Sequence, residues 1–439
     1  MEKDRNQVAA TWFLAFRGVI HARWDNTTCE NRGRHRTRTR RLRRSITRTS
    51  ASSMTILEGG LMPERSGFLG HARTIGLCTM LSRVLGMVRD ILCAALFGTH
   101  WVWDAFSFAF RAPNLFRRLF GEGAMSGAFI PVFTEYLETK PREEAWLMLG
   151  KVFTALLTAL LSIVLIGELA FIVAPFLHEF QPTGSLALRL LLVMFPYLLF
   201  ICLVALAMGI LNSLGHFFMP AFSPAMLNVC WIAAIGFVYF GPQMTPERKV
   251  FVLALAILFA GVVQLAMQVP VLRKLGVPIR LDFRFDHPAV RQVARLWAPV
   301  VFGMGIVQLN VLMDGLIAIG FSHQPGGPDS FSLFGLTIRY PMQEGANSTL
   351  YFAERLYQLP LSVLGTAMAT AVLPTFSRHF ARGDHEGLAA TLSLALRVIF
   401  FVGVPASVAI MVLSEPMVDL LFKRGKFTEQ SVERTAMVV

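Results

Sequence analysis

Long apolar runs separated by short polar segments dominate the chain. A membrane-spanning helix needs about 20 mostly apolar residues, and nine runs reach that length. They lack the alternation of apolar and polar residues that marks the strands of a membrane β-barrel. The pattern predicts an all-α polytopic membrane protein with spanning helices near 72–98, 102–133, 152–177, 185–212, 221–241, 250–271, 296–321, 348–378 and 393–414.

Basic loop residues set the expected orientation, because Lys and Arg accumulate on the cytoplasmic side. Segment 273–295 holds six of them, and loop 378–390 falls on the same side. Loop 178–184, on the opposite side, holds none, although Arg248–Lys249 and the basic cluster at 423–426 run against the rule. We therefore expect the N-terminus in the cytoplasm.

Composition agrees with a membrane protein but sets the first 65 residues apart. Hydrophobic residues make up 54% and charged residues 16%, yet residues 32–48 contain nine arginines and no acid. This stretch cannot bury a core and lacks the apolar region of a signal peptide. Residues 1–65 allow three interpretations. They form a disordered tail that is attracted to anionic lipid, or a tail that binds nucleic acid, or they precede the true start of the protein. The absence of interleaved aromatic residues disfavours nucleic acid, and a start at Met54 or Met62 is favoured because the membrane pattern begins there.

An internal repeat predicts two lobes. AMSGAFIPVF at 124–133 and AMATAVLPTF at 367–376 share one pattern of Ala, Pro and Phe. A coincidence between Ala-rich helices is the alternative, but the flanking helices also correspond, as in transporters built from parallel repeats. We expect an N-lobe of six spans over 66–275. A partial C-lobe over 276–439 would hold three spans and the start of a fourth, as in a fragment or an early-terminated reading frame.

Charged residues within the predicted spans are the candidate functional groups, because intramembrane charges are costly. Helix ends near the headgroups, or mutual neutralisation, could account for single charges. The first two spans, however, contain five arginines and only three acids. Guanidinium groups bind phosphate oxygens in a bidentate fork. The set predicts a central cationic cavity for an anionic substrate, formed by Arg83, Arg89, Asp90, Asp104, Arg111, Asn114, Arg117, Arg118, Glu122, Glu354 and Arg355.

Motifs for catalysis, metal binding and ATP use are missing from the sequence. The five cysteines form no CxxC pair, and the ten histidines lie mostly in loops or in the N-terminal tract. No Walker motif is present. We therefore expect a transporter without a cofactor rather than an enzyme.

Several segments resemble the MurJ/MviN lipid II flippase family of the multidrug, oligosaccharidyl-lipid and polysaccharide exporter superfamily. The resemblance covers about 70–439. It is carried by SRVLGMVRD (82–90), PNLFRRLFGEGAMSGAFIPVF (113–133), NSLGHFFMPAFSPAMLN (212–228), YFAERLYQLPLSVLGTAMATAVLP (351–374) and LFKRGKFT (421–428).

The resemblance implies fourteen helices in two lobes around a cationic cavity, of which this chain would hold nine or ten. It implies that Arg83, Arg89, Arg117 and Arg355 hold the diphosphate of lipid II, and we add Asn114 to that site. Asp90, Asp104, Arg111, Arg118, Glu122 and Glu354 are then expected to orient the arginines or to exchange partners between states. Asp314 resembles a sodium ligand, so sodium ion or the membrane potential is the implied driving force. The chain departs from the family in residues 1–65, in a longer loop at 322–347, and in lacking the last four helices.

These observations predict an inner-membrane protein that flips lipid-linked peptidoglycan precursor to the periplasmic leaflet by alternating access. The expected partners are lipid II, membrane lipids and other cell-wall synthesis proteins, without nucleic acid. One alternative is export of another undecaprenyl-diphosphate-linked glycan, and another is a truncated lipid-binding scaffold that does not transport. A drug exporter for cations is disfavoured because its cavity would need acids.

Overall fold

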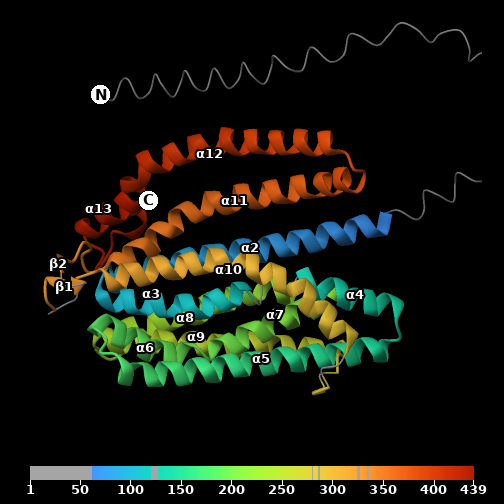
Figure 1. The fold of residues 1–439 in the computed structure, drawn as a ribbon, viewed down its shortest axis with the longest axis horizontal. Coiled ribbons are helices and arrows are strands. Elements are labelled where there is room, and N and C mark those ends of the chain that lie inside the picture. Colours follow the sequence, from blue (N-terminus) through green and yellow to red (C-terminus); the bar gives the residue numbers. More distant parts are fainter. Residues whose placement is uncertain (1–61, 120–126, 279, 285–286, 324–326, 334–335) are drawn as a thin grey trace, which may run out of the picture. The chain divides into compact units, whose positions relative to one another are not determined.

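The computed structural model describes residues 62–119, 127–278, 280–284, 287–323, 327–333 and 336–439. The chain divides into two compact units, Met1–Leu69 and Gly70–Val439. The helices are α2 (Met62–Phe97), α3 (Trp101–Phe116), α4 (Ile130–Thr139), α5 (Arg142–Leu177), α6 (Pro182–Met194), α7 (Tyr197–Ser213), α8 (Phe218–Phe240), α9 (Pro246–Lys274), α10 (Pro288–Gly320), α11 (Ala346–Ala381), α12 (His385–Phe422) and α13 (Glu429–Val438) (Figure 1).

Helices cover the nine predicted spans, and one of the spans is bent. The span predicted at 102–133 divides into α3, which ends at Phe116, and α4, with residues 120–126 outside the described part. The span predicted at 185–212 divides into α6 and α7, which meet at a bend of 44°. Pro196 stands at that bend, where it cannot donate the backbone hydrogen bond that a continuous helix needs. The fold is therefore the all-α membrane architecture that the sequence predicts.

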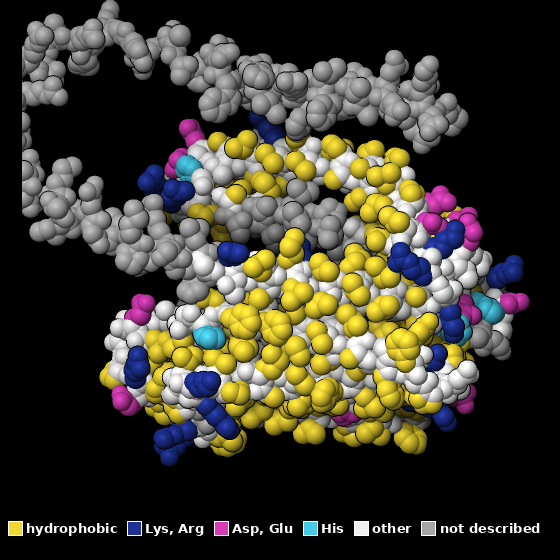
Figure 2. Space-filling model, turned by 180° about the vertical axis from the view of Figure 1, so that it is seen from behind, with side chains coloured by type: hydrophobic (Ala, Val, Ile, Leu, Met, Phe, Trp, Pro, Cys, Tyr) yellow, Lys and Arg dark blue, Asp and Glu magenta, His cyan; other side chains and the backbone are white. Residues whose placement is uncertain are grey.

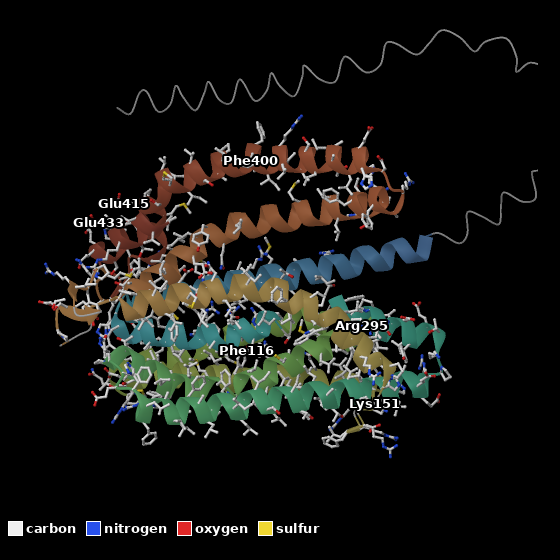
Figure 3. The ribbon with its side chains drawn as sticks, viewed as in Figure 1. Phe116, Lys151, Arg295, Phe400, Glu415 and Glu433 are labelled. Atoms are coloured by element: carbon white, nitrogen blue, oxygen red, sulfur yellow. The ribbon has the colours of Figure 1, made fainter. Side chains whose placement is uncertain are left out.

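Apolar surface covers the middle of the helical unit. Among the described helices, α5, α8, α9, α10 and α12 are long and apolar enough to span a membrane, and α6 with α7 makes a possible sixth span. Figure 2 shows hydrophobic side chains over the middle of one face, with charged side chains toward the two ends. In Figure 3, Phe116 lies between Lys151 and Arg295 toward one end and Glu415 and Glu433 toward the other. This distribution suits a bundle embedded in lipid.

Helix α3 lies at the centre of the packing, in contact with α6, α7, α9, α10 and α11. Its Trp103 is fully buried and stacks on Phe352 of α11 with ring centroids 6.1 Å apart. Phe106 and Phe110 make T-shaped contacts with Trp231 on α8. These aromatic contacts fix α3 against both halves of the chain, so side chains on α3 face neighbours from each half.

The end of the bundle near the β-strands, termed the hairpin end, is closed by loops from both halves. Strands β1 (Ser330–Leu333) and β2 (Leu336–Arg339) pair antiparallel within the long loop before α11. Tyr340 follows β2, and Gln181 directly precedes α6. The hydroxyl of Tyr340 accepts a hydrogen bond of 2.7 Å from Gln181 Nε2. The long loop is therefore attached to the first half of the chain.

Three glycines with positive φ form a close backbone joint at the hairpin end. Their φ angles are +60° at Gly98, +88° at Gly345 and +59° at Gly425. A Cβ at any of them would collide with a carbonyl oxygen of a distant segment. These oxygens are those of Lys426 at Gly98, of Thr99 at Gly345 and of Ala95, in the last turn of α2, at Gly425. Only glycine allows both this conformation and this approach. We call these three residues the three-glycine joint.

At the opposite end, the linker between α9 and α10 is bound to α5. The backbone N–H of Asp282 donates to Thr154 Oγ1 at 2.9 Å, and its carboxylate lies 3.9 Å from Lys151 Nζ. A Cβ at Gly150 would lie 2.8 Å from the carbonyl oxygen of Arg280, so the linker passes directly over this glycine. The linker thus joins the two halves while packed on the first.

Candidate functional site

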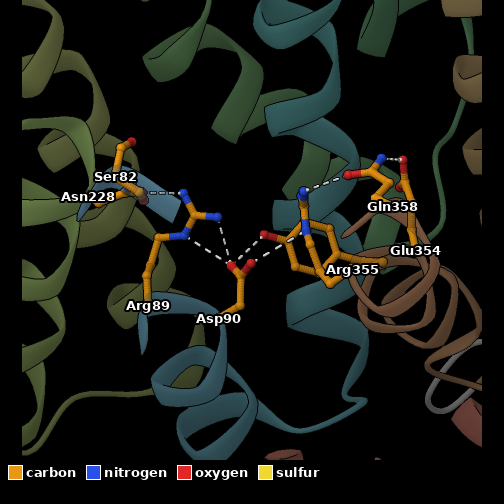
Figure 4. Close-up of polar contacts among 8 residues, drawn as sticks. Ser82, Arg89, Asp90, Asn228, Glu354, Arg355 and Gln358 are labelled. Atoms are coloured by element: carbon orange, nitrogen blue, oxygen red, sulfur yellow. Dashed lines mark hydrogen bonds and ion pairs between the residues drawn. The ribbon is translucent and has the colours of Figure 1, made fainter. Parts of the chain in front are cut away.

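Asp90 is a buried carboxylate shared by two arginines. Arg89 Nε and Nη2 donate to its Oδ1 at 3.0 and 2.8 Å, while Arg355 Nε lies 3.4 Å from its Oδ2 (Figure 4). Asp90 and Arg89 are 3% and 8% exposed. Because α2 supplies Arg89 and α11 supplies Arg355, this carboxylate draws cations from the two halves of the chain to one point.

Neighbouring side chains fix the direction of both guanidinium groups. Arg89 Nη1 donates to Asn228 Oδ1 at 2.8 Å, and its guanidinium lies 4.5 Å from the ring centroid of Trp231. Arg355 lies 4.5 Å over the ring of Tyr351, whose hydroxyl donates to Asp90 Oδ1 at 3.0 Å. Such contacts hold charged groups in a set geometry before a ligand arrives.

The end of α3 adds two further arginines. Arg117 Nε donates to Asn114 Oδ1 at 2.9 Å, as their helical spacing predicts. Arg117 and Arg118 lie on a π-helical turn at 117–119, four residues after Pro113. Proline removes a helical hydrogen bond, and π-turns of this kind are frequent at functional sites.

The arginines described above line a cavity of about 390 Å³. Its walls come from α2, α3, α7, α8, α9 and α11, together with the turn after α3. Four arginines line it and no Asp, Glu, Lys or His does, among the described residues. The predicted residues that meet at this cavity are Arg89, Asn114, Arg117, Arg118 and Arg355.

A second cavity of about 30 Å³ continues toward α10. Arg111 lines it and donates through Nη1 to the carbonyl oxygen of Val311 at 3.3 Å. Glu354 also lines it and accepts a short hydrogen bond from Gln358 Nε2. A Cβ at Gly315 would lie 2.8 Å from Arg111 Nη1, so this glycine lets α10 approach α3. Arg111 and Glu354 thus lie beside the larger cavity.

Asp104 bonds to the start of α11 and not to an arginine. Its Oδ2 accepts from the N–H of Gly345 at 2.9 Å, and its Oδ1 from the N–H and hydroxyl of Ser348 at 2.6 and 2.5 Å. Asn347 Nδ2 adds hydrogen bonds to the Asp104 carbonyl oxygen and to Ser107 Oγ. A carboxylate at a helix N-terminus satisfies unpaired N–H groups and favours the helix dipole. Of Asp104 and Asp90, both expected to orient the arginines, Asp90 contacts them in this structure.

Arg83 and Asp314 lie apart from the cavity. Arg83 is exposed on α2 and does not line the cavity, although Ser82 beside it does. Asp314 is exposed on α10, and no cluster of three His, Cys, Asp or Glu side chains fit for a metal occurs in the described part of the chain. Glu122 lies outside the described residues.

Apart from Asn114, sequence reasoning missed the neutral polar residues of the site. Asn228 bridges Arg89 and the carbonyl oxygen of Ser82, to which its Nδ2 donates at 2.9 Å. Gln264 on α9 lines the cavity and is 2% exposed. Each is a single amide in an apolar run. Such a residue indicates that a polar group is buried, but it does not indicate which residue it contacts. The arrangement as a whole presents fixed positive charge and neutral amides to an anionic ligand.

Comparison with known proteins identifies the family of this chain. The family model described as Lipid II flippase MurJ matches residues 93–439, so it begins just after Arg89 and Asp90. The Probable lipid II flippase MurJ of Vibrio cholerae is 36% identical over 374 residues, or 82% of this chain and 66% of that protein. The Lipid II flippase MurJ of Burkholderia cenocepacia is 34% identical over 83% of this chain and 67% of its own length. The chain thus spans about two thirds of the length of these curated relatives.

Solved structures agree. A lipid II flippase MurJ in an inward closed conformation is similar with a TM-score of 0.64 and 25% identity, over 83% of this chain and 70% of its own. An inward-facing multidrug resistance MATE family transporter shares the fold with a TM-score of 0.60 and 14% identity, over 81% of this chain and 75% of its own. The matched family and the spanning helices lead to one conclusion: the chain belongs to the lipid II flippase MurJ family and is a multi-pass protein of the inner membrane.

Proposed function

We propose that the chain moves lipid II, the lipid-linked peptidoglycan precursor, from the cytoplasmic to the periplasmic leaflet by alternating access. The observation that carries this proposal is the cavity of about 390 Å³, whose lining among the described residues holds four arginines and no acid. Charged groups inside a membrane protein are costly and mark functional sites by default. A diphosphate offers several oxygens to guanidinium groups that stay charged in any environment.

The contacts of the arginines suit capture of a diphosphate. Arg89 is held by Asp90, Asn228 and the face of Trp231, so it needs little ordering on binding. Arg355 shares Asp90 at a longer distance of 3.4 Å and is 24% exposed, so it can turn toward a ligand at small cost. Arg89 would position the diphosphate, and Arg355 on α11 would then turn toward the bound diphosphate.

The hairpin end would be the closed side in this state. The bonds of Asp104 to Gly345 and Ser348 and the three-glycine joint tie loops of both halves together there. With the N-terminus in the cytoplasm, this end faces the periplasm. Transport would require these ties to break while the opposite end closes, so that the cavity is open to one side at a time.

Binding and transfer test the proposal separately. The purified full chain is mixed with lipid II and examined by native mass spectrometry, and the chain in vesicles is assayed for appearance of lipid II in the opposite leaflet. We expect Arg89→Ala and Arg355→Ala to lose most binding, because each removes a charge-assisted contact. Arg248→Ala is the matched control, since Arg248 is an exposed arginine beyond the cavity.

The outcomes separate the competing functions. Binding lost in both cavity variants but kept in the control supports the diphosphate site. Equal binding by all three proteins contradicts it. Binding without transfer would favour a lipid-binding scaffold, and equal transfer of another undecaprenyl-diphosphate-linked glycan would favour a broader exporter.

A further inference from the structure

The cavity has a second wall made of neutral polar groups, opposite in character to its arginines. Asn212 at the end of α7, Ser223 near the start of α8 and Gln264 on α9 all line it. Apolar residues of α7 such as Ile201 and Val204 surround them. A cavity that served only to hold an anion would not need buried amides and a hydroxyl on this wall, because each must find a hydrogen-bond partner.

Gln264 has bonding capacity that the protein leaves unused. Its Nε2 donates to the carbonyl oxygen of Ser223 at 2.7 Å, yet its Oε1 is buried and accepts no hydrogen bond from the described residues. Rotation about the last torsion of a glutamine is broad, so the amide can turn, exchange its bond to Ser223 and present this oxygen to a donor in the cavity that the side chain lines. Buried amide oxygens are seldom left without a donor in native proteins.

Asn212 and Ser223 extend this capacity. The Asn212 amide is half-buried and makes no side-chain hydrogen bond within the described part of the chain. Ser223 Oγ accepts a weak bond of 3.4 Å from Gln268 Nε2, which leaves its own hydroxyl hydrogen to donate. Together the three side chains offer donors and acceptors without net charge.

Neutral donors and acceptors beside a cationic wall suit a sugar joined to a diphosphate. Hydroxyl and acetamido groups of a sugar both donate and accept, whereas a second phosphate or a carboxylate would meet no cation on this wall. The volume of about 390 Å³ is at the lower end of ligand sites, which run from about 300 to 1,000 Å³. The cavity therefore has room for the part of the ligand next to the diphosphate and not for a long glycan.

We propose that Asn212, Ser223 and Gln264 form a subsite for the sugar unit attached to the diphosphate. This inference rests on the proposed function and specifies how the same cavity distinguishes a loaded carrier lipid from a bare one. The arginines bind both lipids, and the amide and hydroxyl wall adds affinity only when a sugar is present. A wall built to hydrogen-bond a ligand rejects the analogue that lacks those groups, because its polar atoms stay unpaired.

The test compares two lipids that differ only in the sugar-bearing headgroup. Affinities for lipid II and for undecaprenyl diphosphate are measured by native mass spectrometry on the full chain, as wild type and as Asn212→Ala/Gln264→Leu. We expect the wild type to prefer lipid II and the variant to lose about tenfold of that preference, as two lost neutral hydrogen bonds imply. Affinity for undecaprenyl diphosphate should stay within about twofold, because the arginines are intact.

Asn347→Ala is the matched control. It removes a fully buried amide on α11 that does not line the cavity and bonds instead to the Asp104 carbonyl oxygen and to Ser107 Oγ. We expect it to keep the preference for lipid II. A double variant that keeps the preference, or a wild type that binds both lipids equally, overturns the sugar subsite while leaving the diphosphate site standing. A wild type that binds neither lipid overturns the proposed function together with the subsite.

Discussion

Asp90 Oδ2 on α2 lies 3.4 Å from Arg355 Nε on α11, and the same carboxylate binds Arg89 through its other oxygen. One acid therefore holds two cations from opposite halves of the chain. Two guanidinium groups so close together repel each other unless a negative charge lies between them. The position of Asp90 makes the pair compatible with folding before any anion is bound.

The first prediction concerns this carboxylate. Asp90→Asn leaves two arginines facing each other without a counter-charge, and we expect it to lower the free energy of unfolding by about 3 kcal/mol, the lower end for breaking a buried pair. Thermal unfolding of the detergent-solubilised chain measures this change. Asp329→Asn is the control, since the Asp329 side chain is 82% exposed beside His323 and should matter by less than about 0.5 kcal/mol. A similar small effect of both variants would contradict the role of Asp90.

The second prediction concerns the start of α11. Asp104→Ala removes the acceptor of the Gly345 and Ser348 N–H groups. Loss of such a cap costs about 1 kcal/mol, so we expect amide exchange at these two positions to be about five- to tenfold faster. Hydrogen exchange read by mass spectrometry measures this. Exchange that stays unchanged at 345–348 would show that other contacts hold the helix start.

The third prediction concerns the three-glycine joint. Gly425→Ala must accept both a φ of +59° and a collision with the carbonyl oxygen of Ala95, whereas Gly215→Ala accepts only a φ of +75° in open space. We expect a loss of about 1 kcal/mol at Gly215 and of about 3 kcal/mol or more at Gly425. Paired thermal unfolding of the two variants separates conformational strain from the collision. Equal losses would mean that the loops separate freely.

The fourth prediction concerns pH at the start of α12. Asp384 Oδ1 accepts from the Gly387 N–H at 2.8 Å and its Oδ2 lies 2.8 Å from His379 Nδ1, and these bonds lower the pKa of the exposed carboxyl. Because the folded pKa lies below the unfolded value of about 3.9, its stabilising effect is complete above that value and is lost as pH falls through the folded pKa. Protection of the Gly387 amide in wild type, relative to Asp384→Ala, should therefore fade only below about pH 4. A difference that fades near pH 6 would assign the effect to another group.

The apolar pattern predicted the positions of all the spanning helices, because lipid requires long apolar stretches whatever their neighbours are. It did not predict the bend between α6 and α7. Pro196 stands in a run as apolar as any other, and hydrophobicity carries no information on helix direction.

Charge within the spans likewise led to the cavity, since Arg89, Arg117 and Arg355 stand out in apolar sequence. The pairing of those charges could not be derived. Asp104 meets Gly345 and Ser348, which lie far along the chain, and spacing along one helix cannot reveal a partner on another. Neutral groups such as Gln264 were missed because a single amide gives too weak a signal in sequence.

The source of each arginine gives the cavity a further property. Arg89 and Arg117 belong to the first half of the chain, whereas Arg355 comes from α11. Any movement of α11 away from α2 takes one positive charge out of the cavity. An anion would then be held less tightly, and by thermodynamic linkage the bound anion must resist that movement to the same degree. The affinity for an anion and the distance between α2 and α11 are therefore coupled. An arrangement that keeps Arg355 beside Asp90 would bind the anion more tightly than one that separates these residues.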